Sequence, residues 1–218
     1  MTVVLLIPIS YKAAPCSELT AEGIPDQDKI VDLSYPISSM PILSYWPTGK
    51  PFKLERVART WTVTEQGYWY ASNNYGPTNE HGGAHVDAPV HFNTHGRTIE
   101  EIPLKEWIGP VIIIDVSQKS LKNSDYLVNT DDIKEWEKEY GEIPKGAWIV
   151  MNSGWGKYWP NKVRYLGTDL TGAEAIPHFH FPGFSPQACR FLTEERSVKG
   201  IALDTPSIDH GQSRSVSE

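Results

Sequence analysis

The sequence of 218 residues predicts one mixed α/β domain whose first half is rich in strands. Aromatic and β-branched runs separated by glycine-containing turns, typical of hairpins, occupy the first half. The second half combines short apolar runs, typical of buried strands, with two amphipathic segments typical of helices. We expect this domain to cover residues 30–218, after an N-terminal extension and linker at residues 1–29.

In the first half, the run at residues 30–33 predicts a short strand, and four prolines between positions 36 and 51 forbid a helix there. The runs at 57–64 and 68–71 flank Glu65-Gln66-Gly67 and predict a β-hairpin.

The second half contains three predicted strands and two predicted helices. The strands are at residues 111–114, which we expect to be buried on both faces and to end at Asp115, and at 148–151 and 201–203. The first helix spans 131–140, with Thr130 or Asp131 as N-cap and Gly141 as its stop. The second helix has Ser185 as N-cap, Pro186 in its first turn, and an apolar face that continues toward Gly200.

The N-terminal run at residues 3–9 leaves three interpretations open. It resembles the apolar core of a signal peptide cut near Ala14, but no Lys or Arg precedes it and Pro8 interrupts it. The others are an irregular extension and a first strand. Localisation, secreted or cytoplasmic, therefore stays undecided.

Composition excludes two classes of partner. The net charge is −7 without any basic cluster, so the phosphate-neutralising contribution to nucleic-acid binding is missing. No stretch approaches the ~18 apolar residues of a membrane-spanning helix. The 8 Trp and 10 Tyr are numerous, and they serve either as core filler or as walls of a pocket for a flat ligand.

The strongest functional signal is a cluster of metal-ligating side chains within residues 81–91. In an extended chain His85, Asp87 and His91 point the same way, while the residues between them, Val90 included, pack in the opposite direction. The Gly82-Gly83 turn can fold His81 back beside them. The pattern predicts a His81/His85/Asp87 metal site for Zn or Mn with an open coordination position, as in catalytic sites.

His91 lies further along the same predicted face. It is either a fourth ligand or, as we favour, a general base that takes a proton from the attacking water, because imidazole titrates near working pH. His91 is therefore the expected catalytic residue.

These residues resemble the motif of the cyclase family of metal-dependent hydrolases, His-x-Gly-Thr-His-x-Asp-x-Pro-x-His-Phe. The matching positions are His81, Gly83, His85, Asp87, Pro89, His91 and Phe92. Further similarity at residues 31–34, 99–104, 152–155, 181–184 and 204–209 extends the resemblance over about residues 30–213.

The resemblance implies a swivelling β/β/α fold, a homodimer, and an amidohydrolase that acts on a non-peptide C–N bond. Two substrates are implied: the formamide of N-formylkynurenine in tryptophan catabolism, which we favour, and the lactam of isatin. The resemblance also places metal ligation on His81, His85 and Asp87, and acid/base catalysis on His91.

The sequence departs from the family pattern at two places. Ala84 replaces the motif Thr and removes a hydroxyl that could orient a ligand. Family members also carry a further metal-binding His and Glu beyond the region of Gly211, which no residue here matches. This predicts a truncated form, completion of the site by water, His210 or Gln212, or a catalytically dead member that only binds ligand.

Aromatic and acidic residues elsewhere are candidates for the substrate site. Trp155 and Trp159 follow a predicted strand end on a glycine-rich loop, and Trp69 lies in the predicted hairpin. We expect these three to be candidate walls for an aromatic ring. Asp204 and Asp209 are assigned either to loop capping, the favoured interpretation, or to the pocket rim or a second metal.

Overall fold

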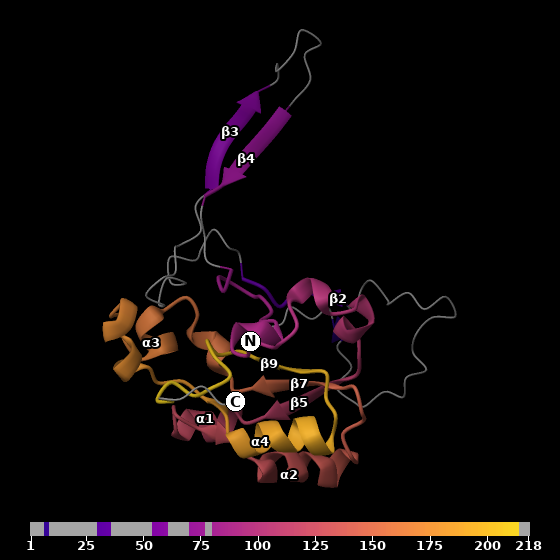
Figure 1. Cartoon of the computed structure of the whole chain (residues 1–218). Helices are drawn as coiled ribbons and strands as arrows, with labels where there is room; N and C mark the ends of the chain where they lie inside the picture. Colours follow the sequence, from indigo (N-terminus) through magenta and orange to yellow (C-terminus); the bar gives the residue numbers. More distant parts are fainter. Residues whose placement is uncertain (1–6, 9–29, 36–53, 61–69, 77–79, 214–218) are drawn as a thin grey trace.

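The computed structural model describes residues 7–8, 30–35, 54–60, 70–76 and 80–213, and Figure 1 shows their arrangement. The predicted proline-rich loop, the predicted hairpin turn, and Trp69 lie outside these residues. In the described part the chain forms a mixed α/β body from which one β-hairpin extends (Figure 1). None of the described helices is long and apolar enough to cross a membrane.

The body is built on a parallel sheet of three strands. These are β5 (Val111–Asp115), β7 (Trp148–Asn152) and β9 (Gly200–Leu203), hydrogen-bonded in the order β5-β7-β9. All three coincide with the predicted apolar runs, which are therefore confirmed. Because the strands are parallel, their carboxyl ends lie at one edge of the sheet, where binding sites of α/β proteins are found.

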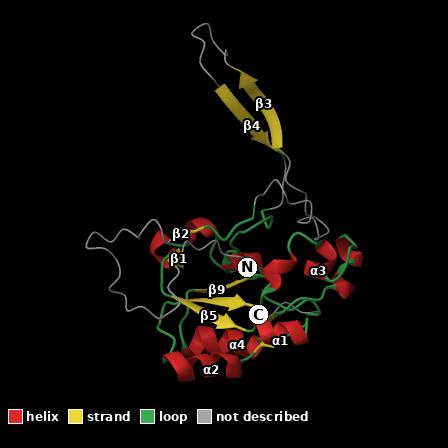
Figure 2. Ribbon diagram, turned by 180° about the vertical axis from the view of Figure 1, so that it is seen from behind, coloured by secondary structure: helices red, strands yellow, loops and turns green. Residues whose placement is uncertain are grey.

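Helices cover one face of this sheet, as Figures 1 and 2 both show. They are α1 (Ser117–Lys122), α2 (Thr130–Tyr140) and α4 (Pro186–Arg190), the last continuing as a π-helical turn, Phe191–Glu195. The main core lies between them and the sheet, where Ile149 and Leu192 are fully buried. The helix after Ser185 is confirmed in its start, because Ser185 Oγ accepts a hydrogen bond from the Ala188 N–H.

Two details of the predicted elements are wrong. The N-cap of α2 is Asn129, whose side chain accepts from Asp131 and Asp132, rather than Thr130 or Asp131. Strand β5 is not buried on both faces, since Ile113 is 50% exposed. The reason is that β5 is an edge strand, which periodicity cannot distinguish from a central one.

The predicted stop of α2 is confirmed, because Gly141 has a φ of 95° at the C-cap.

The other face of the sheet carries a smaller cluster. Trp148 and Ala202 are buried there, and Val86 and Trp107 pack against them. The segments on this face and around the body are short 3₁₀ and α-helical turns. Their bounds are Pro89–His91, Ile99–Glu101, Leu104–Trp107, Trp155–Tyr158, α3 at Lys162–Leu166, Gly172–Glu174 and Ile176–His178.

The other strands among the described residues form two-stranded pairings. Strands β3 (Leu54–Thr60) and β4 (Tyr70–Tyr75) form the predicted antiparallel hairpin and extend away from the body in Figures 1 and 2. Strand β4 ends four residues beyond the predicted end at Ala71. Strands β6 (Leu127–Val128) and β8 (Gly183–Phe184) pair in parallel.

The short strands β1 (Ile7–Pro8) and β2 (Ile30–Val31) are antiparallel. This pairing agrees with the interpretation of the N-terminal apolar run as a first strand.

Candidate metal centre

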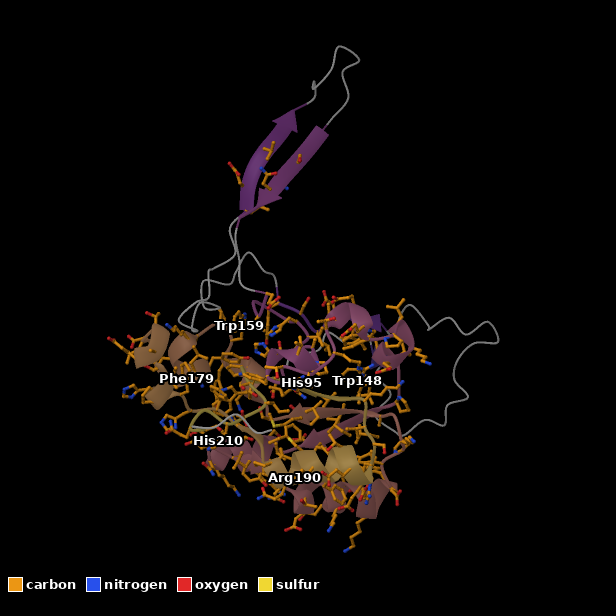
Figure 3. All side chains as sticks on the ribbon, viewed as in Figure 1. His95, Trp148, Trp159, Phe179, Arg190 and His210 are labelled. Atoms are coloured by element: carbon orange, nitrogen blue, oxygen red, sulfur yellow. The ribbon has the colours of Figure 1, made fainter. Side chains whose placement is uncertain are left out.

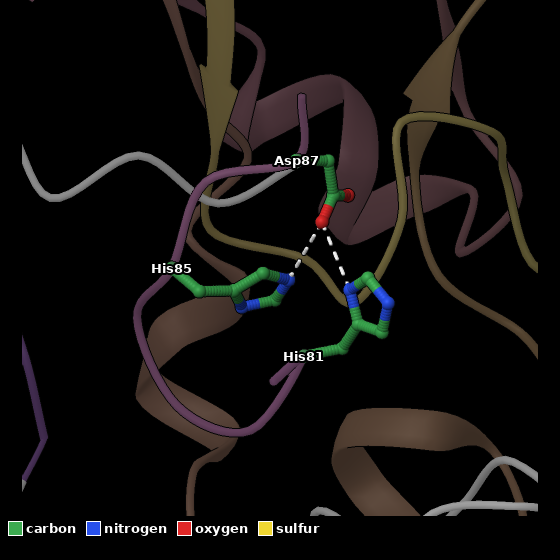
Figure 4. A group of neighbouring side chains, drawn as sticks. All are labelled: His81, His85 and Asp87. Atoms are coloured by element: carbon green, nitrogen blue, oxygen red, sulfur yellow. Dashed lines mark hydrogen bonds and ion pairs between the residues drawn. The ribbon is translucent and has the colours of Figure 1, made fainter. Parts of the chain in front are cut away.

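The candidate site is built on a tight turn that leads into an extended segment. Residues 81–84 form the turn, and Gly83 has a φ of 81°, a conformation that glycine adopts at little cost. The turn brings His81 back beside His85 and Asp87, as Figure 4 shows, so the predicted grouping is confirmed in the structure. Val86 lies between His85 and Asp87 and packs on the sheet, so the side chains of His85 and Asp87 point away from the sheet.

The three side chains converge on one oxygen. His81 Nδ1 lies 2.9 Å and His85 Nε2 3.2 Å from Oδ1 of Asp87 (Figure 4). The other ring nitrogen of His85, Nδ1, lies 2.8 Å from the carbonyl oxygen of Gly83. When Nδ1 carries the proton and donates it to that carbonyl, Nε2 presents its lone pair to the site, as metal-ligating histidines require.

This donor set fits a divalent metal ion. Ligands at the ordinary zinc–nitrogen distance of about 2.0–2.1 Å lie roughly 2.9–3.4 Å apart in octahedral or tetrahedral geometry. The donor separations of 2.9 and 3.2 Å fall in this range, and all three donor atoms lie within 4.8 Å of one another. Two imidazoles and a carboxylate suit Zn or Mn among the common ions. In the described part of the chain, no other His, Cys, Asp or Glu joins this group.

The electrostatics of Asp87 favour its charged form. Partial burial raises its pKa, and the combined lowering effects of hydrogen bonding and nearby positive charge, the contact with His85 among them, are larger, so the pKa of Asp87 lies well below its usual range. The carboxylate is therefore ionised at neutral pH and ready to bind a cation.

The backbone that leads to His91 differs from the prediction. The chain is extended only as far as Ala88 and then enters the 3₁₀ turn Pro89–His91, so the predicted continuous strand is wrong. Proline at the start of the turn explains this, because its fixed φ suits a helical first position. In consequence Val90 is 41% exposed rather than packed against the sheet.

The 3₁₀ turn still places His91 next to the donors. Its ring centroid lies 4.1 Å from that of His81. Partial burial lowers the pKa of His91, the charge of Asp87 raises it and that of His81 lowers it, with a net decrease. A neutral imidazole beside the donor group can accept a proton.

The aromatic candidates have different surroundings. Trp155 is only 5% exposed and its Nε1 donates to the carbonyl of Tyr165, which is the environment of a core residue. Trp159 is partly buried and stacks on Tyr35 with ring centroids 5.3 Å apart. Figure 3 shows Trp159 on the side of the body from which the hairpin extends. Sequence reasoning did not single out Tyr35, because no local signal links it to a residue so distant along the chain.

The remaining candidates from the sequence lie outside the donor group. Asp204 holds the loop after β7 through hydrogen bonds, which agrees with its favoured assignment to loop capping. Gln212 donates its side-chain amide to the Phe179 carbonyl, and His210, labelled in Figure 3, is not among the converging donors. The prediction that His210 or Gln212 completes the site is thus not supported by the described geometry.

Comparisons with known proteins identify the family of this chain. The Cyclase family model matches residues 31–210. An isatin hydrolase of Roseibium aggregatum is 36% identical over 138 residues, which cover 61% of this chain and 49% of that protein. A kynurenine formamidase of Bacillus cereus is 28% identical over 182 residues, 82% of this chain and 69% of that protein. The chain thus spans about half the length of the isatin hydrolase.

Solved structures are similar as well. Isatin hydrolase A from Labrenzia aggregata, bound to benzyl benzoate, superposes with a TM-score of 0.70 at 31% identity, covering 84% of this chain and 70% of that one. Isatin hydrolase A from Ralstonia solanacearum gives a TM-score of 0.69 at 29% identity, with coverages of 84% and 69%. Since the family model covers most of the sequence and the motif residues converge in space, the chain belongs to the Cyclase family.

Proposed function

We propose that this chain carries the metal-binding and proton-transfer residues of an amidohydrolase that opens an aryl amide bond. The observation that carries the proposal is the convergence of His81, His85 and Asp87, with the His91 ring adjacent to His81. Relatives named kynurenine formamidase and isatin hydrolase support the reaction class, because both names denote hydrolysis of a C–N bond next to an aromatic ring.

Each residue has a defined task in this reaction. His81 and His85 offer neutral ring nitrogens and Asp87 offers a carboxylate oxygen to one Zn or Mn ion. When bound, such an ion supplies Lewis-acid activation of water and of the amide carbonyl. The Gly83 carbonyl holds the His85 ring in the required tautomer.

His91 takes the proton of the attacking water and returns it to the departing nitrogen. Its lowered pKa keeps the imidazole neutral near pH 7, which a base requires before the reaction begins. Its position outside the converging donor group favours this role over that of a fourth ligand.

Two substrates fit this assignment. We favour the formamide of N-formylkynurenine, and matches to several kynurenine formamidases over 82% of this chain support it. The lactam of isatin is the second candidate, and it is favoured by the 36% identity to an isatin hydrolase and by the TM-score of 0.70 with a solved isatin hydrolase. We also propose the swivelling β/β/α arrangement and the homodimer of the family for the whole protein.

The test is a parallel assay of one preparation loaded with Zn or Mn. Formate release from N-formylkynurenine without isatin opening assigns the formamidase activity, and the opposite result assigns isatin hydrolysis. A folded protein that retains the metal and turns over neither substrate would instead be a ligand-binding member of the family.

A further inference from the structure

One carboxylate joins the carboxyl ends of two strands. Asp204 directly follows β9 and accepts four hydrogen bonds from the loop after β7. Its Oδ1 accepts from the Ser153 backbone N–H at 3.1 Å and from Ser153 Oγ at 2.5 Å. Its Oδ2 accepts from the N–H groups of Trp155 at 2.7 Å and Gly156 at 3.2 Å. Hydrogen bonds to a charged acceptor are stronger than neutral ones, so this contact holds the loop firmly.

The loop in turn holds an aromatic pair. The carbonyl of Gly156 accepts a hydrogen bond from the Tyr35 hydroxyl at 2.9 Å. The Tyr35 ring stacks on Trp159, and the edge of Tyr165 lies against Trp159 with ring centroids 5.4 Å apart. The Tyr165 hydroxyl donates to the backbone carbonyl of Asp204 at 3.2 Å. These contacts form a closed chain that begins and ends at Asp204.

This network is anchored at the carboxyl end of β9, a strand that also contributes to the cluster under the metal-binding segment. Ala202 belongs with Trp148 to the cluster against which Val86 packs, whereas Ile201 and Leu203 belong to the main core under the helices. Asp204 follows Leu203, the last residue of β9, and lies two positions beyond Ala202 in the sequence. Val86 separates the metal donors His85 and Asp87 in sequence. The Asp204 contacts and the metal donors are therefore supported by the same strand.

We propose that Asp204 is a positioning residue for substrate binding. By fixing the loop from Ser153 to Gly156, it holds the Tyr35 and Trp159 rings in a stack that packs against the aromatic ring of the aryl amide. A rigid, prearranged aromatic surface binds a flat ring without an ordering cost at the moment of binding. This inference rests on the proposed function, because it assigns the aryl-binding side of the same site.

The experiment compares the Asp204→Asn variant with the wild-type full-length protein, both loaded with metal. Asparagine keeps the size but replaces one acceptor oxygen with an amide nitrogen, so part of the loop contacts is lost. We expect an unchanged metal content, a KM for the aryl amide raised about tenfold, and a kcat changed less than threefold. Asp125→Asn is the matched control, because Asp125 is also a partly buried carboxylate and pairs with His180 outside the network. It should leave KM unchanged.

A second variant tests the proposal even if the first variant does not fold. Tyr35→Phe removes only the hydroxyl that Gly156 accepts, on a residue that is 43% exposed, and it should raise KM by a smaller factor at the same metal content. If both variants are folded and metal-loaded and bind substrate with wild-type KM, the positioning role is wrong. If only Tyr35→Phe folds, an unchanged KM in that variant also contradicts the positioning role.

A readout without substrate separates this proposal from the proposed function. Near-ultraviolet circular dichroism reports fixed aromatic packing, and Trp159→Phe identifies the part of the signal that Trp159 contributes. Asp204→Asn should lose that part while Asp125→Asn keeps it. An intact Trp159 signal in Asp204→Asn overturns the proposal even if the wild-type protein hydrolyses neither substrate.

Discussion

The Nε2 atom of His85 lies 3.2 Å from Oδ1 of Asp87, while Nδ1 of the same ring faces the carbonyl of Gly83. One ring therefore connects the backbone of the turn with the group of candidate metal donors. Any change that frees either nitrogen acts on both the orientation of the ring and the binding of the ion.

Replacing His85 with alanine should abolish metal binding. The variant removes one of three donors, and the remaining two leave the ion held by His81 and Asp87 alone. Elemental analysis of the purified protein should show a stoichiometric ion in the wild type and less than a tenth of it in the variant. Unchanged occupancy would show that His85 is not a ligand. His95→Ala is the control, because His95 is exposed and outside the donor group.

Replacing His91 with alanine should lower turnover while the metal stays bound. General-base catalysis contributes about 10²–10⁴-fold, so kcat should fall within that range. Metal content and kcat are measured on the same sample. Loss of the ion together with activity would make His91 a ligand and would contradict its assignment as a base.

Replacing Gly83 with alanine should weaken metal binding about 10–100-fold. Its φ of 81° strains any residue with a side chain, and relief of that strain turns the carbonyl away from His85. The matched control is Gly172→Ala, since Gly172 also has a positive φ, 67°, lies far from the donor group in sequence, and has no heavy atom within 4 Å of an added Cβ. Metal titration should separate the two variants, whereas equal affinities would mean that the Gly83 carbonyl has no orienting role.

The pair of Glu137 and Arg196 should make stability depend on acid pH. Arg196 donates to both carboxylate oxygens at 2.6 and 3.0 Å, and these hydrogen bonds lower the pKa of Glu137 against the opposing effect of burial. A lowered folded-state pKa contributes stability above the ordinary glutamate value of about 4.3, and this contribution is lost as pH falls through the folded-state pKa.

Glu137→Gln should therefore lower the free energy of unfolding by about 1.5–3 kcal/mol at pH 7, and the difference from the wild type should shrink below about pH 4. Urea unfolding at both pH values measures it. Glu139→Gln, on the exposed side of the same helix, is the control. A difference that stays constant down to pH 3 would contradict the ionic origin of the effect.

The sequence predicted the elements whose signals are local. Apolar runs identified β5, β7 and β9, and Ser185 with Pro186 identified the start of α4. The spacing of His81, His85 and Asp87 around two glycines was sufficient to predict their convergence, because a turn and an extended segment have few geometries. The sequence by itself thus determined which three side chains come together as candidate metal donors.

Tertiary structure decided what depends on contacts between distant segments. Whether Ile113 is buried depends on which strand occupies the sheet edge, and whether Trp155 is core or Trp159 is accessible depends on what packs against each. The same holds for Asp204, whose four hydrogen bonds come from a loop about fifty positions earlier. Such contacts form because burial and hydrogen bonding are satisfied by the whole fold. The spacing of residues along the chain therefore does not predict them.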